Sequence, residues 1–293
     1  MKGNAGVRRD QLEPINDDEC SVLEWSVLTR LPADWVFYLC MSVLGGSYVV
    51  LIVAMVAADL FFTTPGHLLA ALNNPEIRYA IKLSLISCTI TAILSLWVGV
   101  PMGYLLSRTQ FWGKTVVDTL LDVPIVLPPL VIGLSLLILF QTAPGRLFQE
   151  NVFWVTFQVP SVILAQFSVS AAFAVRTMRV TFDQISPRTE QVAMTLGCTR
   201  AQAFWRVAMP EARRGLLTAA TLAWARALGE FGPILIFSGA TRMRTEVLST
   251  TVWLEFNISN LEAGIAVSLL MIAAAVIVLI LMRTLGLRGT GLV

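Results

Sequence analysis

The chain has 293 residues, of which 56% are hydrophobic and only 14% charged, and its formal net charge is +2. Soluble chains carry roughly 25% charged residues, so much of this chain must face something other than water. The small net charge argues against nucleic-acid binding. Four cysteines without a CxxC pair and a single histidine argue against a disulfide framework or a zinc site. We therefore expect a membrane protein that uses no metal, cofactor or catalytic residue.

Six apolar stretches are long enough to be membrane spans, since crossing the hydrocarbon core takes about 20 mostly apolar residues in a helix. They lie at about 35–58, 83–106, 123–140, 152–175, 216–237 and 263–282. The sequence thus predicts an all-helical membrane domain over residues 35–283. The fifth stretch is unusual because Arg226 and Glu230 interrupt it.

Polar segments flank these spans at both ends of the chain. Residues 1–34 are predicted to be an N-terminal tail, and residues 284–293 a short second tail. Within the first tail, residues 17–28 fit either a short helix on the membrane surface or a disordered segment. The apolar stretch 35–58 is too long for a cleaved signal, so we expect it to remain as an anchor.

The positions of Lys and Arg predict the orientation. With the N-terminus inside, 15 of the 21 Lys and Arg residues fall on the cytoplasmic side, seven of them in the loop 176–214. The opposite side holds only Arg78, Arg146, Arg242 and Arg244. The positive-inside rule therefore predicts that both termini and the loop 176–214 are cytoplasmic.

The first half of that loop carries the start and stop signals of a helix. Ser186 suits the N-cap and Pro187 the first helical position. Gly197 suits the left-handed position that follows a helix. A helix is therefore predicted between Pro187 and Gly197.

The second half predicts another helix. Thr199 and Gln202 form a T-x-x-Q capping box, and Pro210 is expected to end the helix. Its apolar face repeats at i, i+3, i+4 and i+7 through Ala201, Phe204, Trp205 and Ala208. Three interpretations compete: a hairpin packed on the protein's own spans, a helix-turn-helix for DNA, or a helix that docks into a soluble partner. Because the loop is held between two membrane spans, the DNA interpretation is disfavoured. The sequence does not decide between the other two interpretations.

Two features lie within the spans themselves. Gly99 and Gly103 have the spacing of a helix-packing face. Arg226 and Glu230 are four residues apart, so each offsets part of the other's insertion cost, which is at least about 2.5 kcal/mol for an isolated charge at mid-bilayer. We weigh equally a gate or pathway element and an ion pair that only fixes the fifth span.

The loop also resembles a known motif. The segment EQVAMTLGCTRAQAFWRVAMP, Glu190 to Pro210, resembles the EAA loop of ATP-binding cassette importer permeases. Gly197 and Pro210 have the motif's thirteen-residue separation, and Ala193 matches its second alanine. Gln191 stands where the family usually has glutamate and Val192 where it has the first alanine, while Glu190 lies one place too early.

Two further segments strengthen the resemblance. ARALGEFGP, Ala225 to Pro233, looks like the fifth span of molybdate, tungstate and sulfate permeases. VDTLLDVPIVLPPLVIGLSLL, Val117 to Leu137, looks like their third-span region. The likeness extends from about Ile77 to Met282.

The resemblance implies a type I importer permease fold in a bacterial or archaeal cytoplasmic membrane. Its implied partners are a second permease subunit, most simply an identical copy, two cytoplasmic ATP-binding subunits, an external oxyanion-binding protein and membrane lipid. ATP hydrolysis would belong to the partner chains, so this chain is not itself an enzyme. The coupling helix would contact the ATPase through Glu190, Gln191, Ala193, Gly197, Thr199, Ala201, Phe204, Trp205 and Pro210.

The resemblance favours molybdate or tungstate as the imported oxyanion, ahead of sulfate or thiosulfate, because molybdate systems commonly use one permease twice. A secondary transporter or channel that works without an ATPase is the alternative of a different class. Such a protein would not need the cytoplasmic loop in this form. A membrane-anchored regulatory protein would predict a sizeable soluble domain, and no such segment is evident in the sequence.

Overall fold

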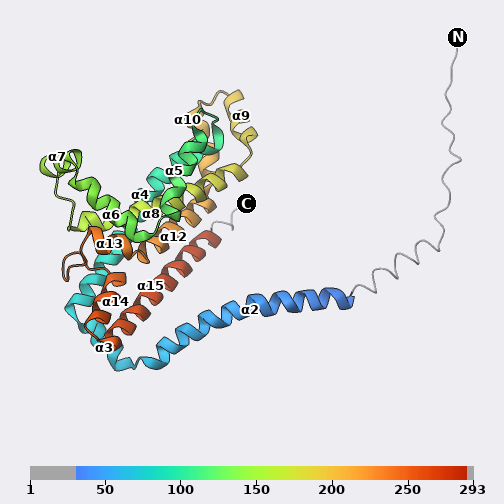
Figure 1. Ribbon diagram of the computed structural model, residues 1–293. Coiled ribbons are helices and arrows are strands. Elements are labelled where there is room, and N and C mark those ends of the chain that lie inside the picture. The colour runs from blue at the N-terminus through green and yellow to red at the C-terminus, as the bar shows by residue number, and fades with distance from the viewer. Residues whose placement is uncertain (1–30, 289–293) are drawn as a thin grey trace, which may run out of the picture. The chain divides into compact units, whose positions relative to one another are not determined.

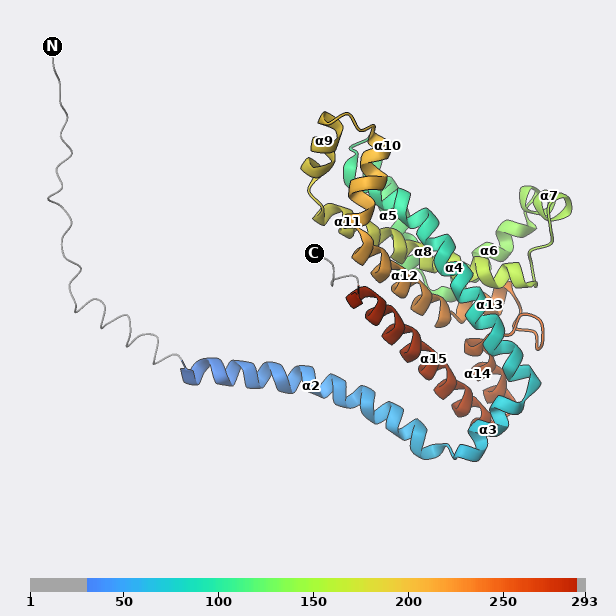
Figure 2. The same ribbon diagram turned by 180° about the vertical axis from the view of Figure 1, so that it is seen from behind.

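The computed structural model describes residues 31–288, and every regular element in that range is a helix (Figures 1 and 2), which confirms the predicted all-helical class. The predicted tail helix at 17–28 and residues 289–293 lie outside the described residues. Within the described range, four helices are long and apolar enough to cross a membrane, or five if one bent pair counts as a span. The predicted number of six is therefore not confirmed.

The first predicted span is the helix α2, Leu31–Phe62. Its stretch Trp35–Phe62 has a mean hydropathy of 2.3. Its apolar side chains are mostly exposed, as expected of residues that face lipid tails. This helix therefore meets the length and composition of a membrane anchor.

The core of residues 59–288 is built on two long helices. These are α4, Pro75–Arg108, and α8, Val159–Gln184, and α12, Arg213–Leu228, packs against both. The α4–α8 contact passes over two glycines, as predicted: a Cβ on Gly99 would lie 3.0 Å from Ala174 Cβ, and one on Gly103 only 2.8 Å from Met178 Cβ. Small residues let the two backbones approach closely.

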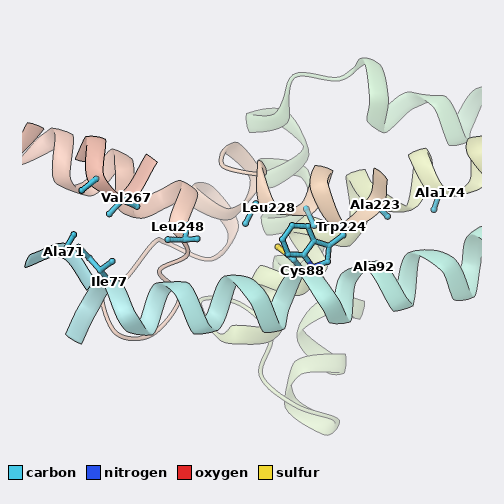
Figure 3. Close-up of a cluster of buried hydrophobic side chains, with 12 residues drawn as sticks. Ala71, Ile77, Cys88, Ala92, Ala174, Ala223, Trp224, Leu228, Leu248 and Val267 are labelled. Atoms are coloured by element: carbon cyan, nitrogen blue, oxygen red, sulfur yellow. The ribbon is translucent and has the colours of Figure 1, made fainter. Parts of the chain in front are cut away.

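The last helix, α15, Leu261–Arg288, packs against α12 and against α14, Leu248–Asn257. The short α3, Pro65–Asn73, lies beside α15 and α4. Figure 3 shows the apolar cluster that joins these helices, with Trp224 of α12 beside Cys88 of α4. The predicted sixth span, 263–282, falls within α15.

The predicted third span is bent. It corresponds to α5, Lys114–Val126, and α6, Pro129–Gln141, whose axes differ by 113°. Pro128 and Pro129 lack backbone N–H groups and constrain the residues before them, so the helix stops at Val126 and restarts. A further helix, α7, Ala143–Asn151, follows α6.

The predicted fifth span is broken. After α12 the chain leaves the helix at Gly229, and α13, Gly232–Phe237, restarts with Pro233 in its first turn. The start of α13 lies so close to α6 that a glycine is needed there, because a Cβ on Gly232 would lie 2.9 Å from Pro129 Cβ. Apolar composition predicted one span here, but the packing of α6 against α13 requires a break.

The predicted fourth span and loop are shifted along the chain. The helix α8 begins at Val159, where Pro160 fits the first turn, and continues to Gln184. Residues 176–184 are therefore helix, and the segment outside the long helices is 185–212. It contains α9, Pro187–Thr195, α10, Arg200–Ala203, a π-helical turn η1, Phe204–Ala208, and α11, Met209–Glu211. We call residues 187–211 the α9–α11 segment.

The contact at Gly103 can be tested by the variant Gly103→Ala. The added Cβ would lie 2.8 Å from the backbone N of Arg179 as well as from Met178 Cβ, so the two helices must separate. We expect a loss of about 1–3 kcal/mol, seen as a lower midpoint of thermal unfolding in detergent. Gly264→Ala in α15 is the matched control, since its new Cβ would meet its nearest atoms at an ordinary 3.8 Å. An equal effect of both variants would contradict the close α4–α8 contact.

Candidate functional site

The start of the α9–α11 segment forms as predicted. The Ser186 side chain accepts a hydrogen bond from the Arg188 N–H at the start of α9, with Pro187 in the first turn. Gly197 follows the helix with φ +93°, where its lack of a Cβ avoids strain. The N–H of Cys198 then bonds to the Ala193 carbonyl, which satisfies one of the free acceptors at the helix end.

The second helix begins as predicted but does not end as predicted. Thr199 and Gln202 form the reciprocal capping box, with N–H to side-chain oxygen distances of 2.9 and 3.3 Å. The helix then widens into η1, where the Met209 N–H bonds to the Phe204 carbonyl five residues earlier. This wider turn accommodates Pro210 without ending the helical path, which continues to Glu211.

The predicted apolar stripe is divided between an inward and an outward side. Phe204 faces inward, with its ring centroid 4.7 Å from that of Tyr104, and Ala208 is fully buried. Trp205 faces outward with 66% of its surface exposed, and Ala201 is also exposed. One part of the stripe therefore packs on the protein itself, and Trp205 lies on the surface.

The outward surface of the segment contains two apolar residues that sequence reasoning missed. Val192 of α9 and Leu196, the residue after its last turn, are four residues apart and are 57% and 81% exposed. Their i, i+4 spacing was the available signal. Val192, Leu196 and Trp205 together are called the outward apolar residues of the segment.

The remaining residues that were predicted to contact the ATPase differ in how exposed they are. Gln191, Gly197, Thr199 and Pro210 are exposed, and Ala193 is half-buried. Glu190 is buried and hydrogen-bonded to α4, so it does not belong to the outward surface. Figures 1 and 2 place α9 and α10 at one end of the helices α4 and α12, and α3 and α14 at the other.

Arg226 and Glu230 form the expected ion pair. Arg226 Nη1 lies 2.6 Å from Glu230 Oε2, with 30% and 1% of the two side chains exposed. The contact lacks hydrogen-bond alignment, and both carboxylate oxygens are buried without a hydrogen-bond partner. Arg226 also lies 5.8 Å from the centroid of the Phe173 ring. The pair is thus held by charge attraction alone, at the point where α12 ends.

Backbone contacts surround this ion pair with close-packed small residues. The Glu230 carbonyl accepts a hydrogen bond from Ser249 Oγ at 2.7 Å. On the other side of the break, a Cβ on Gly133 of α6 would lie 2.7 Å from Pro233 Cα. The backbone of residues 230–233 therefore contacts both α14 and α6 just after the end of α12.

A second charged cluster, between α13 and α14, was missed by the sequence analysis. Arg242 pairs with Glu76 at the start of α4 and with Glu255 of α14, the latter at 2.9 Å. Glu246 is fully buried beside them, and this burial raises the pKa of its carboxyl. Arg242 and Glu76 are 166 residues apart, so their spacing in the sequence did not indicate this contact. The cluster joins the loop before α14 to the start of α4.

Family and sequence comparisons agree on one kind of protein. Residues 98–288 match the model of the family described as binding-protein-dependent transport system inner membrane component. A probable molybdenum ABC transporter permease protein of Haloferax volcanii is 33% identical over 231 residues, covering 79% of this chain and 84% of the relative. The sulfate transport system permease protein CysT of Salmonella typhimurium is 31% identical, covering 73% and 78%. The molybdate/tungstate transport system permease protein WtpB of Pyrococcus abyssi is 30% identical, covering 85% and 95%.

Solved structures share the fold at much lower identity. A chain of a bacterial alginate ABC transporter, in complex with an alginate pentasaccharide-bound periplasmic protein, aligns with a TM-score of 0.72 and 15% identity, covering 90% of this chain and 98% of that one. A chain of the inward-facing MetNI methionine ABC transporter aligns with a TM-score of 0.60 and 16% identity, covering 73% and 96%. At these identities the likeness shows the fold alone.

Proposed function

Because the chain belongs to the binding-protein-dependent transport system inner membrane component family, we propose that it is the permease subunit of an ATP-driven oxyanion importer. It is a multi-pass membrane protein of the transport type rather than an enzyme. In the proposed assembly, two copies form the pathway, two ATP-binding subunits drive it, and an external binding protein delivers the anion. The membrane is a bacterial or archaeal cytoplasmic membrane.

The proposed substrate is a tetrahedral oxyanion, molybdate or tungstate. The names of the relatives from Haloferax volcanii and Pyrococcus abyssi support this choice. Sulfate is the second candidate, since the Salmonella typhimurium relative is nearly as similar at 31% identity. The two are distinguished by which anion competes for uptake.

The outward apolar residues of the α9–α11 segment carry the proposal. A tryptophan, a leucine and a valine are exposed on a short helical segment, and apolar side chains on a helix are suited to a groove in a partner. We assign that groove to the ATP-binding subunit. Gln191, Ala193, Gly197, Thr199, Ala201 and Pro210 complete the proposed contact surface.

The distribution of charge supports the proposed orientation. Five arginines lie in the stretch 188–214, and the positive-inside rule places such a segment in the cytoplasm, where ATP-binding subunits are found. Both termini lie on the same side in this proposal. The loop that contains Arg242 and Glu246 then faces the external binding protein.

Arg226 and Glu230 are the proposed gate. No hydrogen bond from another residue holds the Glu230 carboxylate, so an anion that approaches Arg226 competes with a single contact. The Glu230 carboxylate would prevent the anion from being bound tightly, because it largely neutralises the charge of Arg226, which then attracts a dianion only weakly. This combination suits a pathway through which an anion passes.

Transport assays test the proposed function directly. The purified chain is reconstituted in liposomes with its ATP-binding subunit and binding protein, and molybdate uptake is measured with and without ATP. We expect uptake only with ATP, reduced by excess tungstate more than by excess sulfate. Equal uptake without ATP would instead indicate a secondary transporter or channel.

The variant Trp205→Ala should weaken association with the ATP-binding subunit. Removing an exposed tryptophan from the centre of an interface costs about 2 kcal/mol or more, close to a thirtyfold change in dissociation constant. Membrane insertion and thermal stability should not change. Trp97→Ala is the matched control, because Trp97 of α4 is also exposed, at 76%, but lies within a span. Unchanged association of Trp205→Ala would refute the docking surface.

Neutralising both partners tests the gate. In the double variant Arg226→Gln with Glu230→Gln, no buried charge is left unpaired, so folding should be retained. We expect molybdate uptake to fall at least about tenfold while ATP hydrolysis continues, because Arg226 no longer presents a positive charge to the anion at the break. Uptake at the rate of the unmodified protein would show that the pair only fixes the helix α12.

A further inference from the structure

Glu190 is anchored to α4 by both oxygens of its carboxylate. Arg108 Nε donates to Glu190 Oε1 at 2.8 Å, and Tyr104 Oη donates to Glu190 Oε2 at 2.6 Å. Only 12% of the Arg108 side chain and 8% of the Glu190 side chain are exposed. Because Arg108 is the last residue of α4, this contact joins the end of a long span to the first turn of α9.

The same arginine also binds the end of α8. Arg108 Nη1 donates to the Phe182 carbonyl and Nη2 to the Ile185 carbonyl, each at 2.9 Å. The last carbonyls of a helix have no partner within the helix and carry its partial negative charge. A single guanidinium therefore binds the carboxylate of α9 and the carbonyl end of α8 together.

Aromatic packing supports these polar contacts on the side of η1. The Tyr104 ring lies edge-on to Phe182 of α8 and to Phe204 of η1, with ring centroids 5.4 and 4.7 Å apart. Around these rings, Met178, Phe182, Ile185, Ala208 and Ala212 form a buried cluster. The inner face of the whole α9–α11 segment is thus fixed to α4 and α8.

We propose that Tyr104, Arg108 and Glu190 form a rigid joint that makes the α9–α11 segment move as one body with α4 and the end of α8. The proposal rests on the proposed function, in which the outward apolar residues receive the motion of an ATP-binding subunit. The outer face of the segment receives the motion, and the joint passes it to the spans. Glu190 is thus a positioning residue that acts within the permease.

The geometry explains why these residue types are required. Arg108 bonds three acceptors of the joint from three separate nitrogens, Nε, Nη1 and Nη2, whereas a lysine would have to reach all three from one nitrogen. Glu190 needs two acceptor oxygens, one for each partner. A glutamate exposed to a partner protein would need neither contact.

The variant Glu190→Ala tests the joint in the reconstituted complex of permease, ATP-binding subunit and binding protein. The outward apolar residues remain, so association with the ATP-binding subunit and ATP hydrolysis should persist. Molybdate transported per ATP hydrolysed should fall about tenfold, because the charge-assisted hydrogen bonds that hold α9 to α4 are lost. Glu211→Ala, which removes an exposed carboxylate of the same segment, should leave this ratio unchanged.

Milder variants keep the test valid if Glu190→Ala folds poorly. Glu190→Gln retains one acceptor oxygen and Tyr104→Phe retains the ring packing, so each should lower the transport ratio less than Glu190→Ala. Tyr104→Phe should have no further effect in the Glu190→Ala background, because both changes remove the same bond. Additive effects of the two changes would count against the joint.

Two results would overturn the proposal. One is a transport ratio in Glu190→Ala equal to that of the unmodified protein. The other is loss of ATPase association in Glu190→Ala, which would mean that Glu190 shapes the docking surface and does not pass on motion. Failure of the docking proposal itself would appear separately, as unchanged association of Trp205→Ala.

Discussion

The burial of a carboxylate at the end of α4 is the constraint on which the rest of this structure depends. Glu190 is 8% exposed and must be matched by a cation and by hydrogen bonds, and both come from α4. Removing one partner of such a buried pair costs about 3–5 kcal/mol. This cost holds the first turn of α9 against the end of α4.

The two ion pairs to which we assign roles, Arg108 with Glu190 and Arg226 with Glu230, differ in how they are held. Arg108 and Glu190 are surrounded by further hydrogen bonds to Tyr104 and to the end of α8. Arg226 and Glu230 have only their mutual attraction, at a break in the helix. A fully satisfied pair favours a single rigid arrangement, whereas a partly satisfied one has fewer contacts that hold it in place. The proposed roles, a joint and a gate, follow from this difference.

The predictable parts of the structure are those set by local sequence. The caps at Ser186 and Thr199 and the left-handed turn at Gly197 depend on a few neighbouring residues, and all three formed as predicted. The packing of Gly99 and Gly103 also followed from their spacing. The family resemblance correctly indicated an importer permease, as the family match confirms.

The unpredicted parts depend on contacts between distant segments. Continuous apolar composition concealed the break between α12 and α13, which the approach of α6 imposes. The 3.6-residue period placed Phe204 and Trp205 on one apolar face, whereas Phe204 packs on Tyr104 and Trp205 is 66% exposed. Glu190 was predicted to contact the ATPase because the motif lies nearby in sequence, whereas its partners Tyr104 and Arg108 lie more than 80 residues away.

The central claim is that the α9–α11 segment and α4 move as one body. A distance between spin labels at the exposed positions Thr195 of α9 and Leu105 of α4, measured by pulsed electron paramagnetic resonance with and without ATP in the assembled complex, tests it most directly. The account predicts the same distance distribution in both states, and a broader one in Glu190→Ala. A shift of more than about 2 Å on ATP binding in the otherwise unmodified protein, the size of a typical helix displacement, would contradict it.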